Sequence, residues 1–131
     1  MKGKVLICGI VTILISCQAQ EYDAKSLASV TVFSSGNNGF IAKKIPQQLI
    51  YEKILTRHHA DNIFINIMHN AKATPEGKAY AACGLWEQQK RAAIHIDKQS
   101  YDLPVTVLQG DVLRKEKLGE LITRIREYGC Q

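Results

Sequence analysis

The side chains best able to do chemistry are four histidines and four cysteines. His58 and His59 are adjacent, so on a helix they would point about 100° apart and could not chelate one ion together. His69 falls off the apolar stripe of its predicted helix, and His95 would share a face with Asp97 only in a strand. The chain also lacks the G-x-S-x-G, H-E-x-x-H, C-x-x-C and phosphate-loop patterns. We therefore expect no catalytic residues, no metal site and no cofactor.

The N-terminal segment has the pattern of an export signal. Lys2 and Lys4 give it positive charge, and an apolar run of about a dozen residues follows from Val5 to Ile15. A membrane-spanning helix needs roughly 20 apolar residues, and this run ends before that, at Cys17. We therefore expect residues 1–17 to be a signal peptide rather than a transmembrane helix.

Two cleavage sites remain open. Leu14-Ile15-Ser16-Cys17 resembles the lipobox of bacterial lipoproteins, which implies lipid on Cys17, and Gln18 resembles the sorting pattern for the outer membrane. On this interpretation the lipid anchors the protein to the periplasmic face of that membrane. The alternative is ordinary cleavage near Ala19, which would leave a soluble periplasmic protein.

Either cleavage leaves two cysteines in the domain, Cys83 and Cys130, because Cys8 leaves with the signal peptide and Cys17 is lipidated or removed. Two thiols in an oxidising compartment are expected to pair, and a bridge closing so long a loop would stabilise the fold by roughly 4 kcal/mol. The alternative is a buried free Cys83 and a frayed Cys130. Because an oxidised Cys83 is no nucleophile, we expect the protein not to be an enzyme.

These groups must be positioned by a single domain over residues 29–131, since the chain left after cleavage is long enough for one modest core. Residues 18–28 are polar and mixed, and we expect them to form a tether. Ser29–Phe33 is rich in β-branched residues and predicts a short strand. The composition of Ser34–Gly39 predicts a turn or loop after it.

Three consecutive helices are expected in the middle of the domain. The first begins at Pro46 and turns Leu49, Ile50 and Ile54 inward. The second follows a cap at Asp61 or Asn62 and carries an apolar i, i+3, i+4 stripe. The third begins at Thr74, whose side chain can cap it, and its small residues allow a close helix neighbour. Their short connections favour antiparallel packing.

The C-terminal part predicts a second strand and a last helix. Pro104–Leu108 is strand-like, and Gln109–Asp111 is a turn signal. The last helix is expected from Lys115, with a cap at Gly129. Together the elements predict a mainly α fold of about four helices with one or two short β segments.

The segment Ala73–Leu85, ATPEGKAYAACGL, resembles the A-T-P-x-G-K-x-Y-A-L-C-G-L helix of a loose group of small exported bacterial proteins and lipoproteins without an established function. The resemblance extends over roughly residues 33–129 and implies export and a HEAT-like arrangement of antiparallel helices. It carries no catalytic residues. Asp111 stands where the group commonly has a cysteine, so a bridge from Cys83 has either moved to Cys130 or is absent.

The net charge argues against nucleic acid as a partner. The net charge of +5 falls to about +3 without Lys2 and Lys4, which is low for a domain that binds nucleic acid.

We expect a non-enzymatic interaction module bound to another envelope protein, for example an immunity or inhibitor protein that neutralises an envelope-acting toxin or hydrolase. A structural or stress-related envelope lipoprotein is the alternative, and an unrecognised enzyme is third. The expected partner surface comprises two loop segments, with Ser34, Ser35, Asn37 and Asn38 in one and Gly110 and Asp111 in the other.

Overall fold

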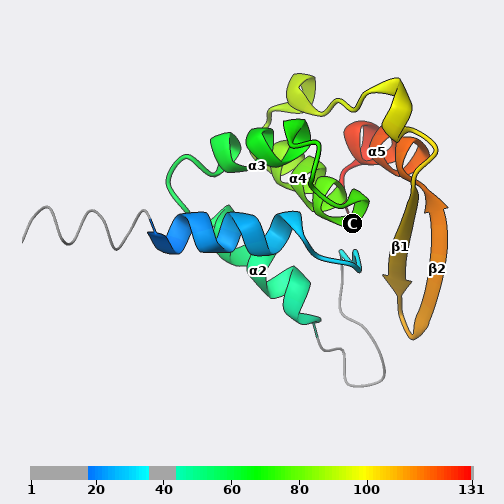
Figure 1. Cartoon of the computed structure of the whole chain (residues 1–131), viewed down its shortest axis with the longest axis horizontal. Coiled ribbons are helices and arrows are strands. Elements are labelled where there is room, and N and C mark those ends of the chain that lie inside the picture. The colour runs from blue at the N-terminus through cyan, green and yellow to red at the C-terminus, as the bar shows by residue number, and fades with distance from the viewer. Residues whose placement is uncertain (1–17, 36–43, 131) are drawn as a thin grey trace, which may run out of the picture.

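The computed structural model describes residues 18–35 and 44–130, and it is mainly helical with one small antiparallel sheet (Figure 1). The predicted mainly α fold with short β segments is therefore confirmed. Cys17, Asn37 and Asn38 lie outside the described residues. The alternative cleavage site near Ala19 lies at the start of the helix over residues 18–28. The elements after the helix over residues 18–28 are α2 (Pro46–Leu55), α3 (Ala60–His69), α4 (Pro75–Glu87), η1 (Arg91–Ala93), η2 (Lys98–Ser100), β1 (Pro104–Gln109), β2 (Val112–Lys117) and α5 (Leu118–Tyr128).

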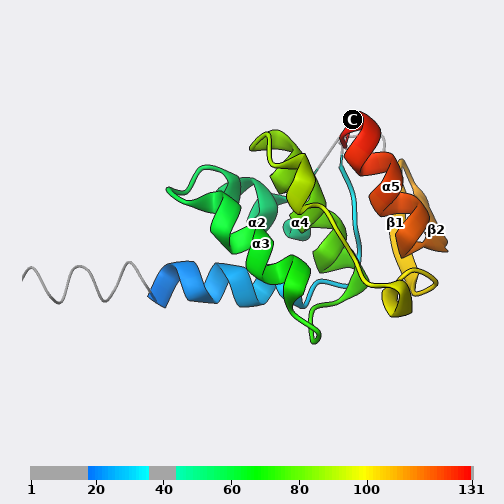
Figure 2. The ribbon, with the colours of Figure 1, turned by 90° about the horizontal axis from the view of Figure 1, so that it is seen from above.

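Helix α4 lies at the centre of the domain, between α3 and α5 (Figure 2). The predicted cap is present, since the Thr74 hydroxyl accepts a hydrogen bond from the Gly77 N–H at 3.0 Å and donates one to the Val30 carbonyl at 2.6 Å. Every residue from 76 to 85 is buried. Gly84 lets Phe64 of α3 approach so closely that a Cβ there would lie 2.3 Å from its ring. The small residues therefore allow close helix packing, as the sequence predicts.

The tether predicted for residues 18–28 is instead a helix that packs on the domain. Leu27 on this helix is fully buried in the core. Asp23 is also buried, and its carboxylate pairs with Arg57 and, at 3.5 Å, with Lys53. A buried carboxylate is stable only with such partners, so these contacts hold the polar helix against the domain. No helix within the described residues is both long and apolar enough to cross a membrane.

The sheet is a hairpin of β1 and β2, in which Val105 pairs with Glu116 and Leu108 with Leu113. The predicted turn is present, and Gly110 adopts a φ of +61° there, which favours glycine. Residues 112–117 pair in β2, so the last helix begins at Leu118 and not at the predicted Lys115. The strand predicted at 29–33 is reduced to a single parallel bridge between Phe33 and Val107.

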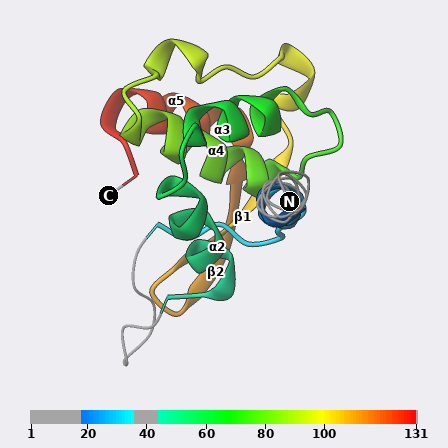
Figure 3. The same ribbon diagram turned by 90° about the vertical axis from the view of Figure 1, so that its left-hand side faces the viewer.

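The C-terminus returns to α4 through a disulfide between Cys83 and Cys130, whose Cα atoms are 5.7 Å apart. Gly129 ends α5 with a φ of +82°, and its N–H donates to the Ile125 carbonyl at 2.8 Å. The predicted glycine cap and the predicted bridge are therefore both confirmed. Figure 3, in which the helix over 18–28 is seen end-on, shows the C-terminus beside α5 and α4.

Two local predictions about α2 and α3 are wrong. Of the residues expected to face inward on α2, Ile54 is fully buried, but Leu49 is 52% exposed, while Gln48 beside it is only 4% exposed. The helix has turned its polar residue toward the core and its leucine toward solvent. Helix α3 begins at Ala60 after His59 in the left-handed conformation, φ 58°, rather than after a side-chain cap at Asp61 or Asn62.

Candidate functional site

The segment Phe33–Ser35 runs beside β1 toward the hairpin turn. The Phe33 N–H donates to the Thr106 carbonyl and the Leu108 N–H donates to the Phe33 carbonyl, both at 2.9 Å. Because the bridge is parallel, the chain leaves Phe33 in the direction of Gly110. The structure thus brings the described parts of the two predicted surface segments to the same end of the hairpin.

The individual predicted residues differ in exposure. Ser35, Gly110 and Asp111 are exposed. Ser34 is buried, and its N–H donates to the Tyr80 hydroxyl oxygen at 3.0 Å. Ser34 therefore attaches the segment to α4, and Ser35 is the serine that faces outward.

An acidic hollow of about 290 Å³ opens next to Ser35. Helices α2 and α4 supply most of its wall, and Glu52 and Glu87 are its two charged residues. No lysine or arginine among the described residues lines it, but Lys44 pairs with Glu52 at 2.6 Å, so Glu87 supplies its unpaired negative charge. The full lining is Phe33, Ser34, Ser35, Gln48, Tyr51, Glu52, Leu55, Tyr80, Cys83, Glu87 and Cys130.

Tyr51 and Tyr80 both line the acidic hollow. Their ring centroids are 5.4 Å apart, and Phe33 packs edge-on against Tyr80 at 4.8 Å. Burial raises the pKa of the Tyr51 hydroxyl well above its usual value, and the carboxylates of Glu87 and Glu52 raise it further. Burial likewise raises the pKa of Tyr80 to about 12. Both hydroxyls are therefore neutral at physiological pH and can act only as hydrogen-bonding groups.

A basic hollow of about 220 Å³ adjoins the acidic one. Its charged residues are Arg114 of β2 and Arg124 of α5, which both pair with Glu116, at 3.2 and 2.6 Å. Two guanidinium groups share one carboxylate, so this hollow keeps a net positive charge. Its other lining residues are Phe33, Ser35, Val107, Leu108, Gln109, Leu121, Ile125, Gly129 and Cys130.

The two hollows share a wall made of Phe33, Ser35 and Cys130. Cys130 is fixed to α4 by the disulfide, and Phe33 is fixed to β1 by its backbone hydrogen bonds. The wall is therefore held from both sides. A partner that meets Ser35 would face negative charge on one side of it and positive charge on the other.

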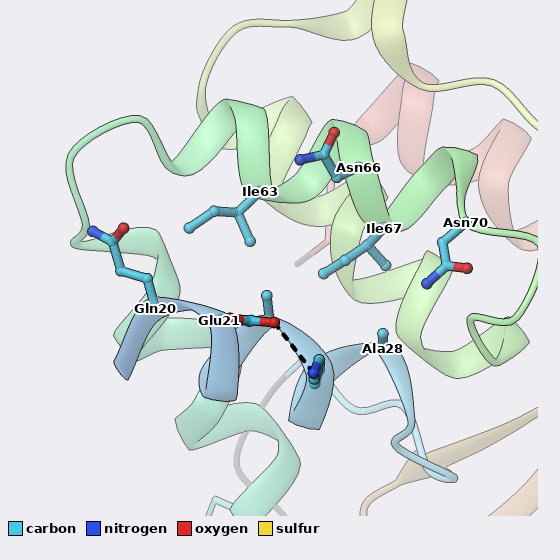
Figure 4. A pocket seen from close by; sticks show the side chains of 9 residues that line it. Gln20, Glu21, Ala28, Ile63, Asn66, Ile67 and Asn70 are labelled. Atoms are coloured by element: carbon cyan, nitrogen blue, oxygen red, sulfur yellow. Dashed lines mark ion pairs between the residues drawn. The ribbon is translucent and has the colours of Figure 1, made fainter. Parts of the chain in front are cut away.

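A third hollow, of about 360 Å³, lies between the helix over 18–28 and α3 (Figure 4). Ile63 and Ile67 of α3 form its apolar wall, and Gln20 and Asn70 lie near its two ends. The predicted tether over residues 18–28 would not pack against α3, so this hollow is not expected from the sequence.

The histidines lie away from these hollows. His58 and His59 are exposed and stack edge-to-face with centroids 4.3 Å apart. His69, His95 and Asp97 border a smaller hollow, but the described part of the chain contains no group of three or more residues placed to hold a metal ion. Asp97 has a structural task, since its side chain accepts a hydrogen bond from the Ser100 N–H at 2.8 Å, and these contacts with Ser100 lower its pKa.

Sequence reasoning missed the helical residues of the acidic hollow. Gln48, Tyr51 and Leu55 of α2 recur at i, i+3 and i+7, and so do Tyr80, Cys83 and Glu87 of α4. This spacing places each set on one helix face. This spacing can be read from the sequence, but the apolar residues of α2, Leu49 among them, predict a different inward face.

No protein-family model, no curated protein and no solved structure matches the chain. The resemblance of Ala73–Leu85 to a group of exported proteins therefore stays a prediction. The functional proposal rests on the sequence and on the geometry of the hollows.

Proposed function

We propose that the chain is a non-enzymatic interaction module of the bacterial envelope, which binds another envelope protein through the surface around Ser35. The observation that carries this proposal is the pair of neighbouring hollows with opposite charge that share Ser35 in their wall. Paired patches of opposite sign orient a protein partner and exclude partners with the wrong charge pattern. The concrete partner class is an envelope-acting toxin or hydrolase that this chain neutralises.

Apolar side chains beside the hollows support a protein as the partner. Val112 and Leu113 follow the hairpin turn and are 64% and 61% exposed. Interfaces between proteins combine such apolar contacts with a polar rim. The hairpin turn would supply the apolar contact, and the two hollows would supply the charged contacts.

The proposed location depends on the N-terminal segment. The lipobox-like sequence ending at Cys17 supports lipid anchoring, and the helix over 18–28 would then connect the anchor rigidly to the domain. Cys17→Ala should move the protein from the membrane fraction to the soluble periplasmic fraction. If the variant stays in the membrane fraction, the lipid anchor is excluded.

The binding proposal is tested by capture from envelope extract. Ser35 is exposed, so Ser35→Trp should fold normally while its large side chain obstructs both hollows. We expect the unaltered protein to capture a reproducible partner and Ser35→Trp to lose it. Gln99→Trp is the matched control, because Gln99 is an exposed polar residue of η2 that lines neither hollow, and it should capture normally. Absence of any reproducible partner, or equal capture by Ser35→Trp, would contradict the proposal.

A further inference from the structure

The smaller hollow that the two separated histidines border also has a lysine of α4 in its wall. Its volume is about 240 Å³, and it lies between the C-terminal end of α3, the N-terminal end of α4 and the segment that joins η1 to η2. We call it the lysine hollow, and its polar lining residues are Lys78, His69, His95 and Asp97. It shares no lining residue with the two hollows beside Ser35, so it is a separate feature of the surface.

Lys78 is buried without a partner for its charge. The residue is 8% exposed, and its ammonium group forms no hydrogen bond or ion pair with any of the described residues. A lysine with so little exposure is uncommon in proteins unless another group compensates its charge, because an unpaired buried charge costs free energy. The Nζ atom is not among the inaccessible atoms that lack a partner in the described part of the chain. It therefore stays accessible, and the lysine hollow is where Lys78 borders open space.

The carboxylate at the lysine hollow does not take up this charge. The Oδ1 atom of Asp97 accepts a hydrogen bond from the Ser100 N–H at 2.8 Å. The hydrogen bonds from Ser100 lower the pKa of this carboxyl most, and the charges of Lys78 and His95 lower it further. Both groups thus lie near Asp97, yet neither forms an ion pair with it within the described residues. The ammonium group of Lys78 remains open to a ligand.

We propose that the lysine hollow binds a carboxylate group, held by the ammonium group of Lys78 with His69 and His95 beside it. A carboxylate has two oxygens that accept hydrogen bonds, an ammonium group has three donors, and each imidazole has at least one. Hydrogen bonds between such charged groups are about twice as strong as neutral ones.

The charge of the hollow favours a carboxylate over other anions. Asp97 already places one negative charge there, so a singly charged carboxylate is repelled less than a doubly charged sulfate. Free small acids and the acidic side chains of proteins both supply a carboxylate, and the test separates these two sources. The inference goes beyond the proposed function and does not depend on the surface around Ser35.

A titration with small probes tests the inference. The probes are acetate, sulfate, N-acetyl-glutamate amide and the neutral compounds acetamide and N-acetyl-glutamine amide, added at constant ionic strength to the ¹⁵N-labelled protein in the form that the cell produces. We expect acetate to shift the backbone amide signals of Lys78, His95 and Asp97, with weaker binding of sulfate and none of the neutral compounds. Binding of N-acetyl-glutamate amide as well would support acidic side chains as the source, and binding of acetate alone would support free small acids. No shift at these residues, or equal responses to acetate and to sulfate or acetamide, would overturn the inference.

Two variants with matched controls complete the test. Lys78→Met keeps an apolar stem in the buried position and removes the charge, so it should bind acetate about tenfold more weakly. Lys72→Met changes an exposed lysine outside the lysine hollow, and it should bind as the unaltered protein does. Equal binding by these two variants would overturn the inference.

A second pair keeps the test decisive if Lys78→Met does not fold. His95 is exposed, so His95→Ala should fold normally, and it should bind acetate about threefold more weakly because it loses one hydrogen-bond donor. His58→Ala is its control, since His58 is an exposed histidine outside the lysine hollow. Equal binding by His95→Ala and His58→Ala would also overturn the inference.

Discussion

Helix α4 and the hairpin end of the molecule are built in opposite ways. In α4 every residue from 76 to 85 is buried, and the disulfide joins its Cys83 to the C-terminus. In β2 five of the six residues are exposed, and Val112 and Leu113 beside the turn are largely open to solvent. The strongest sequence pattern in the chain thus marks the part that holds the fold together. The surface proposed to bind lies where the pattern is weakest.

Loss of the disulfide at α4 should lower the free energy of unfolding far more than any change at the hairpin end. Replacing both cysteines, Cys83→Ser with Cys130→Ser, should lower the free energy of unfolding by about 4 kcal/mol, because the bridge spans 47 residues. Urea unfolding followed by circular dichroism measures the loss, and reduction of the unaltered protein should reproduce it. Two reactive thiols in the denatured, unreduced protein would contradict the bridge.

Disturbing the close packing of α4 against α3 should cause the next largest loss of stability. Gly84→Ala places a Cβ against the fully buried Phe64 ring, and such overpacking costs about 1–3 kcal/mol. Phe64→Leu in the Gly84→Ala background should recover part of this cost, because the smaller side chain makes room. The interaction free energy from the double-mutant cycle measures the recovery, and a value of zero would contradict close packing at this position.

The cap of α4 gives a smaller effect. Thr74→Ala removes the acceptor for the Gly77 N–H and the donor to the Val30 carbonyl, so it should cost about 1 kcal/mol of the free energy of unfolding. Thr74→Ser keeps the hydroxyl and should lose much less. Equal losses in the two variants, measured by urea unfolding, would show that the hydroxyl is not what stabilises the helix start.

The hairpin end should show almost no effect on stability. Leu113→Thr changes an exposed apolar side chain, so the free energy of unfolding should stay within about 0.5 kcal/mol of the unaltered value. Capture of the envelope partner should weaken in the same variant. If Leu113→Thr loses stability but captures the partner normally, the hairpin end stabilises the fold and does not bind, which contradicts the comparison with α4.

Local rules predicted much of the fold. The caps at Thr74 and Gly129, the turn at Gly110 and the pairing of Cys83 with Cys130 follow from residue types at fixed positions, and the structure has all of them. Each depends on neighbours in the sequence or on the count of cysteines, so no tertiary information was needed.

The failures depended on contacts that the local residue pattern does not specify. Tyr22 and Leu27 are the only large apolar residues in the helix over 18–28, and its buried Asp23 pairs with Arg57, which is 34 positions away. Strand β2 is mostly charged and resembles the start of the following helix until its pairing with β1 is known. The ion pair has no local signal, and the turn at Gly110 marks the hairpin without showing where β2 ends and the helix begins.

The candidate site was predicted only in part. Turn composition located Ser35 and Gly110, and the structure brings their segments to one end of the hairpin. The acidic hollow arises because α2 presents Gln48 and Tyr51 toward α4. The face that a short helix turns inward depends on its neighbours, so this part required the structure.

A single variant, Ser35→Trp, separates stability from binding at the surface around Ser35. The free energy of unfolding and the capture of the envelope partner should be measured on the same preparation. We expect the free energy of unfolding to stay within about 0.5 kcal/mol of the unaltered value while capture is lost. Retained capture with unchanged stability would contradict the claim that the surface around Ser35 binds the partner.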